Sequence, residues 1–454
     1  MRQGSADRGM DSETGERVKM KRVYKKQNVY DAANERIAFV FENFERVYLS
    51  FSGGKDSGVL LNLVLDYMKQ NGITQKLGIQ ILDNEANYSH SLEFMQRILV
   101  ANRDMLDIYW CCLPITLPCT VSAYAIDWQC WGVRDEDRWV RPRPTEDYVV
   151  TIDNHPFDFF EEDMSYDDFW DGFSEWYSQG KSCANLIGIR TAESLNRFRA
   201  IMNESKVMLK GEAWTKKNTE HTYNCYPIYD WRTEDIWTAN AKFDWDYNKL
   251  YDVFYRAGVP VHSMRVASPF MSEGKSSLNL YRAIDPDCWA RLCARVQGAN
   301  FLATYGKQLS YRSFTLPEGH TWKSFVKFLL DTLPKEIAEN FKKRFAQSIL
   351  FWGRTGRGLP DDVISDLENN GIRFRLNGTT PHGGNSLRRV VMIPPDELDC
   401  LKSHNSLVTS WKRFALTILK NDHTCKYLGL APTHEQAKRQ RAIVEKYKTI
   451  GERA

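Results

Sequence analysis

The sequence predicts an α/β protein in which a parallel sheet carries helices on both faces and is followed by a mainly helical C-terminal region. Short apolar segments alternate with leucine-rich segments at helical spacing over residues 27–114. The alternation breaks near residue 120 and resumes at CANLIGIR (183–190), and from about residue 290 helical segments dominate. Strands that alternate with helices of this length are typical of a parallel sheet.

The first elements follow one another as helix, strand, turn and helix. Residues 27–45 place apolar side chains at helical spacing, and ERVYLSF then begins an apolar strand. After two glycines, DSGVLLNLVLDYMKQNG has the pattern of a helix buried on one face that stops at Asn71-Gly72. LGIQILDNEA, SHSLEFMQRILVANR and LDIYWCCLP then predict a second strand, a second helix and a third strand.

Changes in composition divide the chain into three parts. We expect a disordered basic N-terminus over 1–26, an α/β domain over 27–285 with an aromatic, acidic insertion at about 120–182, and a mainly helical domain with a basic tail over 286–454. The insertion suits either a helical lid packed on its own domain or a segment that binds a partner. The basic tail fits either a solvated helix face or contact with nucleic acid.

The composition also limits the compartment and the class of protein. No apolar run reaches the length that spans a bilayer, and the N-terminus lacks the apolar core of a signal peptide, so we expect a cytoplasmic protein without membrane contact. The ten cysteines are scattered and form no CxxC pair. Reduced thiols are therefore expected, and neither a disulfide framework nor a zinc ribbon is indicated.

The stretch YLSFSGGKDSGVLL (48–61) predicts an anion site. An apolar strand ends in two glycines, and the next helix begins beside Lys55. Glycines let the backbone approach a ligand, the helix start offers unpaired N–H groups, and Ser52, Ser57 and Lys55 add donors and a positive charge. The stretch matches neither GxxxxGK[ST] nor GxGxxG. In an open parallel sheet, ligands bind at this end of the strands.

SGGKDS resembles the pyrophosphate loop of the N-type ATP pyrophosphatases (the PP-loop superfamily), and the spacing of later motifs resembles the phosphoadenosine phosphosulfate (PAPS) reductase family within it. The resemblance implies a Rossmann-like fold of the adenine nucleotide alpha hydrolase type. It implies an enzyme that binds ATP and Mg²⁺ and in which a second substrate attacks the α-phosphate. It assigns phosphate contact to the loop residues Ser52, Gly53, Gly54, Lys55 and Ser57, and it adds Phe51 and Asp56 as nucleotide-binding residues. Asp56 would also help to hold Mg²⁺.

Three further stretches agree with this family. LDNEA (82–86) makes Asp83 and Glu85 candidates near the ribose and adenine. In IGIRTAESLNR (187–197), the resemblance assigns nucleotide contact to Gly188, Arg190, Glu193 and Arg197, with Arg190 also catalytic beside Lys55 and Asp56. An arginine after a strand can instead close a surface ion pair. YPIYDWRTEDIW (226–237) resembles another family element, although a packed helix start beginning near Thr233 explains it more simply.

The cysteines do not follow the family's reductases. Those enzymes carry a C-terminal Glu-Cys-Gly-Leu-His tail, which this chain lacks, so cysteine-dependent PAPS reductase activity is not expected. Cys111-Cys112 has no later CxxC, so an iron–sulfur cluster is not expected either. Cys111, Cys112, Cys119 and Cys130 are best explained as buried structural thiols, with an unusual metal site as the alternative.

The predicted function is therefore an adenine-nucleotide-binding PP-loop protein of the transferase type. It would cleave ATP between the α- and β-phosphates to adenylate a second substrate, or bind a sulfated adenine nucleotide. Two alternatives stay open. One is a nucleotide-dependent regulator that contacts nucleic acid through basic termini or acts with a ParB/sulfiredoxin-like protein. The other is sulfur transfer to nucleic acid. The end of the chain, WKRFALTILKNDHTCKYLGL (411–430), resembles a subgroup whose C-terminal domain has no known function.

Overall fold

The computed structural model describes residues 26–203, 206–271, 274, 278–300, 314–382, 385–401 and 407–430. The chain forms two compact units. The first, the N-terminal unit, comprises the described residues of Lys26–Val121 and Asp127–Gly306, and the second, the C-terminal unit, contains Ser122–Ile126 and the described residues after 313. Of the predicted basic N-terminus and basic tail, residues 1–25 and 431–454 lie outside the described residues.

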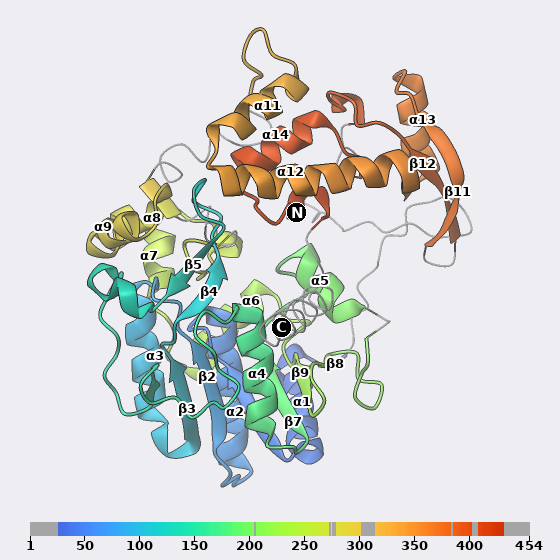
Figure 1. The fold of residues 1–454 in the computed structure, drawn as a ribbon. Helices are drawn as coiled ribbons and strands as arrows, with labels where there is room; N and C mark the ends of the chain where they lie inside the picture. The colour runs from blue at the N-terminus through green and yellow to red at the C-terminus, as the bar shows by residue number, and fades with distance from the viewer. Residues whose placement is uncertain are drawn as a thin grey trace, which may run out of the picture. The chain divides into compact units, whose positions relative to one another are not determined.

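The N-terminal unit is built on a seven-stranded sheet with the order β6-β3-β2-β1-β7-β9-β8 (Figure 1). All neighbouring strands are parallel except β8 and β9. The predicted parallel sheet is thus confirmed. The strands are β1 (Arg46–Ser50), β2 (Leu77–Leu82), β3 (Leu106–Cys111), β6 (Val149–Val150), β7 (Cys183–Ile187), β8 (Thr215–Lys217) and β9 (Thr222–Cys225). A separate hairpin joins β4 (Ile115–Pro118) to β5 (Asp127–Cys130).

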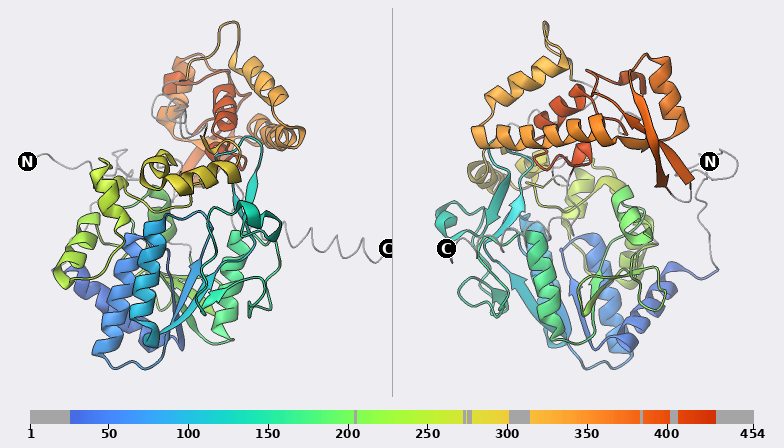
Figure 2. Two further views of the ribbon diagram at one scale, coloured as in Figure 1. Left: turned by 90° about the vertical axis from the view of Figure 1, so that its left-hand side faces the viewer. Right: turned by 45° about the vertical axis from the view of Figure 1, so that its right-hand side comes forward.

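Helices cover both faces of this sheet, as Figure 2 shows edge-on in its left view. Helix α2 (Lys55–Gln70) packs against α1 (Val29–Asn43) on one face. α3 (Ser89–Ala101) lies beside α2, because the Phe94 ring reaches Gly58. The opposite face is covered by α4 (Tyr166–Ser178), whose Phe173 and Tyr177 rings pack on Tyr48 of β1. The remaining helices are α5 (Leu195–Met202), α6 (Thr233–Phe243), α7 (Leu250–Arg256), α8 (Leu278–Ile284) and α9 (Pro286–Arg295).

The aromatic, acidic stretch after residue 120 contributes to the sheet domain itself. It supplies the edge strand β6 and the face-covering helix α4. Ser165 caps α4 by accepting a hydrogen bond from the Asp168 N–H group (3.2 Å), and acids fill the first turn, where they favour helix formation. The rings of this helix form the packed layer on the sheet. Of its acids, Asp167 is exposed, and Asp168, Asp171 and Glu175 are half-buried.

The C-terminal unit combines helices with a small sheet. Phe345 and Phe414 stack with ring centroids 4.5 Å apart in its core. A three-stranded antiparallel sheet, which the helical pattern did not predict, has the order β10-β12-β11. Its strands are rich in Arg, Asn and Thr and do not alternate apolar with polar residues. The sequence therefore lacks the two-residue period by which a strand is predicted. The elements are α11 (Trp322–Thr332), α12 (Lys335–Leu350), β10 (Arg357–Leu359), α13 (Asp361–Asn369), β11 (Arg375–His382), β12 (Asn385–Val391) and α14 (Trp411–Leu419).

Candidate nucleotide site

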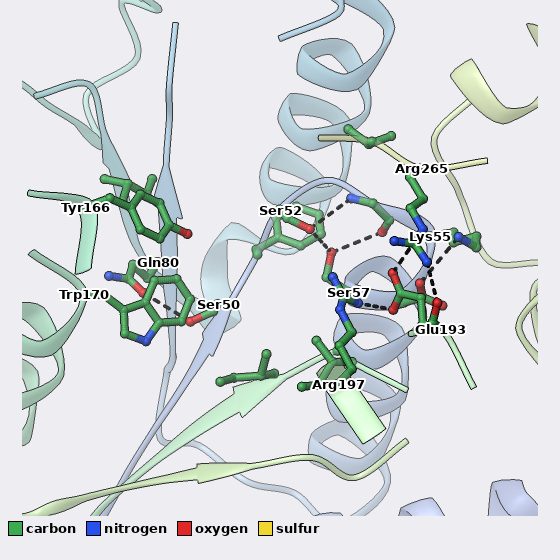
Figure 3. A pocket seen from close by; sticks show the side chains of 18 of the residues that line it. Ser50, Ser52, Lys55, Ser57, Gln80, Tyr166, Trp170, Glu193, Arg197 and Arg265 are labelled. Carbon is green, nitrogen blue, oxygen red and sulfur yellow. Dashed lines mark hydrogen bonds and ion pairs between the residues drawn. The ribbon is translucent and has the colours of Figure 1, made fainter. Parts of the chain in front are cut away.

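A cavity of about 270 Å³ opens at the carboxyl ends of β1, β2 and β7 (Figure 3). β1 lies between β2 and β7, so the helices that follow β1 and β7 leave the sheet in different directions at this point. Open parallel sheets bind ligands at such a reversal of strand order. The cavity is lined by the loop after β1, the start of α2, the loop after β7 and one end of α4.

The loop after β1 makes the turn that the two glycines predict. Gly53 has φ = +67°, a conformation that glycine adopts without strain, and Gly54 is the cap residue of α2. The hydroxyls of Ser52 and Ser57 lie 3.0 Å apart, and Ser57 Oγ donates to the Gly54 carbonyl (3.1 Å). Within the described chain, the N–H groups of Asp56 and Ser57 have no acceptor, as expected in the first turn of a helix. They are available to an anion.

Lys55 is buried at the start of α2. Its backbone N–H donates to the Tyr251 hydroxyl (3.0 Å), and its ammonium Nζ donates to the Met264 carbonyl (3.0 Å). Burial lowers the pKa of Lys55, and the neighbouring Asp56 carboxylate opposes this effect. The Nζ atom lies 3.5 Å from Asp56 Oδ2. Lys55 therefore brings a poorly hydrated positive charge to the cavity wall.

Asp56 is held by Arg190. Arg190 Nε donates to Asp56 Oδ1 (2.6 Å), and a second guanidinium nitrogen lies 3.4 Å from Oδ2. Arg190 is only 2% exposed and also contacts the Thr233 hydroxyl. The structure thus places Arg190 behind the cavity wall, and its predicted contact with a nucleotide stays a prediction.

This pairing bears on the predicted Mg²⁺ site. Both oxygens of Asp56 already face cationic side chains, those of Arg190 and Lys55. Within the described chain, no group of three His, Cys, Asp or Glu residues is arranged to hold a metal ion. The residues present therefore do not fit a divalent cation held by Asp56.

A cationic rim closes one end of the cavity. Glu193 and Arg197 form an ion pair, and Arg265 donates to the Glu193 carbonyl. Arg265 Nε also lies 3.9 Å from the Glu193 carboxylate. Two guanidinium groups thus share one carboxylate, which leaves an excess of positive charge at this end. Arg197 and Glu193 were predicted as site residues, whereas Arg265 and Tyr251 were not. Arg265 stands in VHSMRVASPF (261–270) and Tyr251 in LYDVFYRAGVP (250–260), and neither stretch carries a recognisable motif.

The opposite end of the cavity is aromatic and uncharged. Tyr166 and Trp170, both from α4, form one side, and Ser50 and Gln80 form the floor (Figure 3). The sequence pointed to the aromatic segment, but it did not single out these two rings. Their spacing of four residues places them on one face of the helix. This spacing is the sequence feature from which the pair of rings could have been predicted.

Asp83 and Glu85 lie outside the cavity lining. Asp83 accepts from the Trp110 indole N–H (2.7 Å) and forms an ion pair with Arg141. Glu85, which has φ = +66°, accepts from the backbone N–H groups of Trp131 (2.9 Å) and Val140 (2.8 Å). Both carboxylates are thus occupied in fixing the segment 127–141, and their predicted contact with ribose or adenine stays a prediction.

Gly188 and Phe51 line the cavity, and their predicted contact with a nucleotide stays a prediction. A Cβ atom on Gly188 would lie 2.8 Å from the backbone nitrogen of Ser57. A side chain here would push the end of β7 away from the start of α2. Gly188 is therefore needed for the packing that shapes the loop, whether or not a ligand also approaches it.

The cysteines near the sheet are buried thiols. Cys111, Cys112, Cys119 and Cys130 are each at most 1% exposed. Burial raises the pKa of Cys111, Cys112 and Cys130 well above the ordinary value for a thiol. Such thiols are poor nucleophiles. In the C-terminal unit, burial likewise raises the pKa of Cys425 to about 12.

In the part of the chain that the structure describes, no helix is both long and apolar enough to cross a membrane.

Comparison with known proteins identifies two domain families along the chain. Residues 140–258 match the phosphoadenosine phosphosulfate reductase domain, and residues 258–439 match a domain of unknown function, DUF3440. The uncharacterized protein YbdN of Escherichia coli (strain K12) is 32% identical over 413 residues, which cover 89% of this chain and 91% of YbdN.

Solved structures show weaker likeness. The FMN adenylyltransferase of Candida glabrata, in complex with FAD and inorganic pyrophosphate, is 16% identical with a TM-score of 0.30, over 49% of this chain and 58% of that one. The chain thus spans less than two thirds of that protein. The PAPS reductase of Candida auris, in a phosphate complex, is 10% identical with a TM-score of 0.26, over 54% of this chain and 96% of that one.

The U34-tRNA thiolase NcsA of Methanococcus maripaludis, with its [4Fe-4S] cluster, is 12% identical with a TM-score of 0.28, over 62% of this chain and 81% of that one. Scores this low carry no argument about activity. The assignment of the chain to a family is based instead on the extent of the YbdN match and on the two domain matches. The chain belongs to the family of YbdN, and it carries a match to the phosphoadenosine phosphosulfate reductase domain followed by a match to the DUF3440 domain.

Proposed function

We propose that the chain binds an adenine nucleotide in this cavity and cleaves ATP between the α- and β-phosphates to attach AMP to a second substrate. The observation that carries the proposal is the polarity of the cavity. One end has Lys55, Arg197, Arg265 and the N-terminus of α2, and the other end has Tyr166 and Trp170. A nucleotide has the matching polarity, with phosphates at one end and a flat base at the other.

The proposed reaction needs only charge neutralisation and positioning from the chain. A nucleophilic oxygen of the second substrate attacks the α-phosphorus, the bond from that phosphorus to the bridging oxygen breaks, and pyrophosphate leaves with the bonding electron pair. Negative charge grows on the leaving group. The N–H groups of Asp56 and Ser57 and the Lys55 ammonium lie where this charge would develop, and preorganised donors of this kind stabilise a transition state. No step requires a thiolate.

The geometry around Lys55 supports its role in binding. Its ammonium donates to the Met264 carbonyl and is close to one carboxylate, so a phosphate would offer it a stronger acceptor than the neutral carbonyl. The Tyr251 hydroxyl, which accepts from the Lys55 N–H group, occupies a position that a phosphate oxygen could take. Both donors of Lys55, its backbone N–H group and its ammonium, are therefore directed at oxygen atoms that phosphate oxygens could replace.

Turnover of ATP labelled at the α- or the γ-phosphate tests the reaction. Once a second substrate is supplied from a fractionated extract, we expect pyrophosphate to be released and the label of α-labelled ATP to move to the second substrate as an attached AMP group. Lys55→Ala should weaken ATP binding by about 2–3 kcal/mol, because a charge-assisted hydrogen bond is lost. Lys69→Ala is the matched control, since Lys69 is exposed at the other end of the same helix.

Three outcomes would contradict the proposal. Products of ADP and phosphate would exclude cleavage at the α-phosphate. Equal affinity of the wild type and Lys55→Ala for ATP would exclude the loop as the phosphate site. Tight binding of PAPS together with failure to bind ATP would favour the sulfated nucleotide as the ligand and would rule out adenylation.

A further inference from the structure

The hairpin of β11 and β12 in the C-terminal unit is an exposed, polar ribbon. It lies beside α13 at the end of the unit that is remote from α11 (Figure 1). Over residues 375–381, every residue except the half-buried Thr380 is exposed. A two-stranded ribbon is not stable by itself in water, and this one is held by β10 and by the buried Val390. The exposed side chains of β11 therefore contribute little to the packing of the unit.

Positive and negative charges are segregated around this hairpin. Residues 369–395 include four arginines and no Asp or Glu. The acids that precede this stretch belong to α13, whose sequence is DDVISDLEN. Arg388 forms an ion pair with one of them, Asp361, at 2.9 Å. The helix thus carries the negative charge of this part of the unit, and the ribbon carries the positive charge.

Three arginines at the hairpin keep their guanidinium groups free. Within the part of the chain that the structure describes, the side chains of Arg354, Arg375 and Arg389 form no ion pair or hydrogen bond. Arg375 is opposite Val391 in the register, and Arg389 lies two residues before Val391, so the two arginines point to the same face. Arg354 lies beside the ribbon, because its carbonyl oxygen is 3.5 Å from the Asn377 amide. Their charges are available to a ligand.

The side chains of the ribbon match a chain of phosphates. Arginine forks bind phosphate oxygens through two hydrogen bonds, and exposed Asn and Thr side chains, here Asn377 and Thr379, also contact phosphates and base edges. β11 and β12 contain no Phe, Tyr or Trp on which an unpaired base would stack, which disfavours a single strand. The major groove of B-form DNA admits a two-stranded ribbon, whereas that of A-form RNA is too narrow.

We propose that the β11–β12 hairpin is a docking surface for the phosphates of double-stranded DNA, with Arg354, Arg375 and Arg389 as the contacts. The inference goes beyond the proposed function, because it gives the C-terminal unit a partner of its own. It also concerns a different segment from the basic termini to which the sequence drew attention. Contacts of this kind bind the DNA backbone without reading its sequence, and they weaken as salt is added.

Fluorescence anisotropy of the full chain with a labelled duplex of about 30 base pairs tests the inference. We expect the logarithm of the binding constant to fall linearly with the logarithm of the salt concentration between about 50 and 200 mM. Each phosphate contact adds about 0.9 to the steepness of this line. In Arg375→Gln/Arg389→Gln, the slope should therefore be smaller by about 2, and the affinity at low salt should fall about tenfold.

Lys327→Gln/Lys342→Gln is the matched control. It removes the same charge from exposed positions on α11 and α12, so it separates a general loss of positive charge from a loss of contacts. Its slope should equal that of the wild type, and thermal unfolding checks that both variants are folded. An unchanged slope in Arg375→Gln/Arg389→Gln would overturn the inference, because another segment would then hold the DNA. Failure of the wild type to bind the duplex at low salt would also overturn it.

Two further probes test the choice of partner. Tighter binding of a single strand of the same length than of the duplex would overturn the assignment to double-stranded DNA. Vesicles of phosphatidylserine and phosphatidylcholine test an acidic membrane surface. Vesicle binding that is lost in Arg375→Gln/Arg389→Gln, without binding of the duplex, would give the hairpin to lipid and overturn the inference. No readout involves ATP, so the result is independent of the proposed function.

Discussion

Arg190 and Asp56 form a buried ion pair in which Arg190 Nε lies 2.6 Å from Asp56 Oδ1. Their side chains are 2% and 11% exposed. The pair joins the loop after β7 to the first turn of α2, and so ties together two walls of the cavity. Removing one partner of such a pair leaves the other charge buried without its main counter-ion.

Arg190→Met should therefore destabilise the protein by about 3–5 kcal/mol, the usual effect of breaking a buried ion pair. The measurement is urea unfolding followed by circular dichroism. Arg197→Met is the control, because Arg197 is 37% exposed in its own ion pair and should change stability by about 1 kcal/mol or less. Equal losses in the two variants would contradict the structural role of Arg190.

Gly188→Ala should force the end of β7 away from the start of α2. The added Cβ would lie 2.8 Å from backbone atoms of Ser57, which cannot move independently of the helix. We expect a loss of about 1–3 kcal/mol in unfolding free energy, as for overpacking in a core, and weaker nucleotide binding. Gly353→Ala is the control, since nothing lies within 4 Å of a Cβ at that position. A stable Gly188→Ala variant with unchanged affinity would refute the close approach.

Glu85→Gln should loosen the segment 127–141. Glu85 accepts from two backbone N–H groups and from Arg295 Nε (3.1 Å), and an amide would turn a donor toward at least one of these donors. We expect a loss of about 2–4 kcal/mol. Faster hydrogen exchange at Trp131 and Val140 would locate the effect. Asp135→Asn, at a more exposed partner of Arg295, should cost much less.

Thiol labelling should reveal one reactive cysteine among those whose side chains the structure describes. Cys293 is partly exposed, and the others are buried. In a Cys400→Ser background, iodoacetamide should modify one thiol quickly, and Cys293→Ser should abolish this phase. Burial raises the pKa of Cys293 above the ordinary value for a thiol, and only the thiolate reacts, so the rate should keep rising with pH beyond the range in which an exposed thiol reaches its plateau. A rate that levels off below pH 8 would contradict the raised pKa.

The sequence predicted those parts of the fold that repeat a simple period. The helix 27–45, the strand after it and the glycine turn all appear within a few residues of their predicted places, as α1, β1 and the loop before α2. The start of the long helix was predictable because Gly-Gly-Lys-Asp-Ser combines a turn with a helix start. The C-terminal hairpin β11–β12 was not, because its polar side chains leave no alternation to detect.

The candidate site was predictable only where a motif marked it. The motif pointed to the loop Ser52–Ser57, whose contact with a ligand stays a prediction. Tyr166, Trp170 and Tyr251 come from distant segments that tertiary packing brings to the cavity. Arg190 was expected to face the ligand, and the structure pairs it with Asp56. An arginine after a strand has the same sequence context in both cases. Whether such an arginine is buried depends on residues far along the chain, and its predicted contact with a nucleotide stays a prediction.

The two edges of the seven-stranded sheet have a consequence for the behaviour of the protein at high concentration. One edge is the two-residue strand β6, and the other is the three-residue strand β8, whose Lys216 and Lys217 are exposed. Short, charged edges offer few free N–H and C=O groups to a strand from another molecule. The long apolar strands lie inside the sheet, so this sheet is protected against edge-to-edge aggregation while it stays folded.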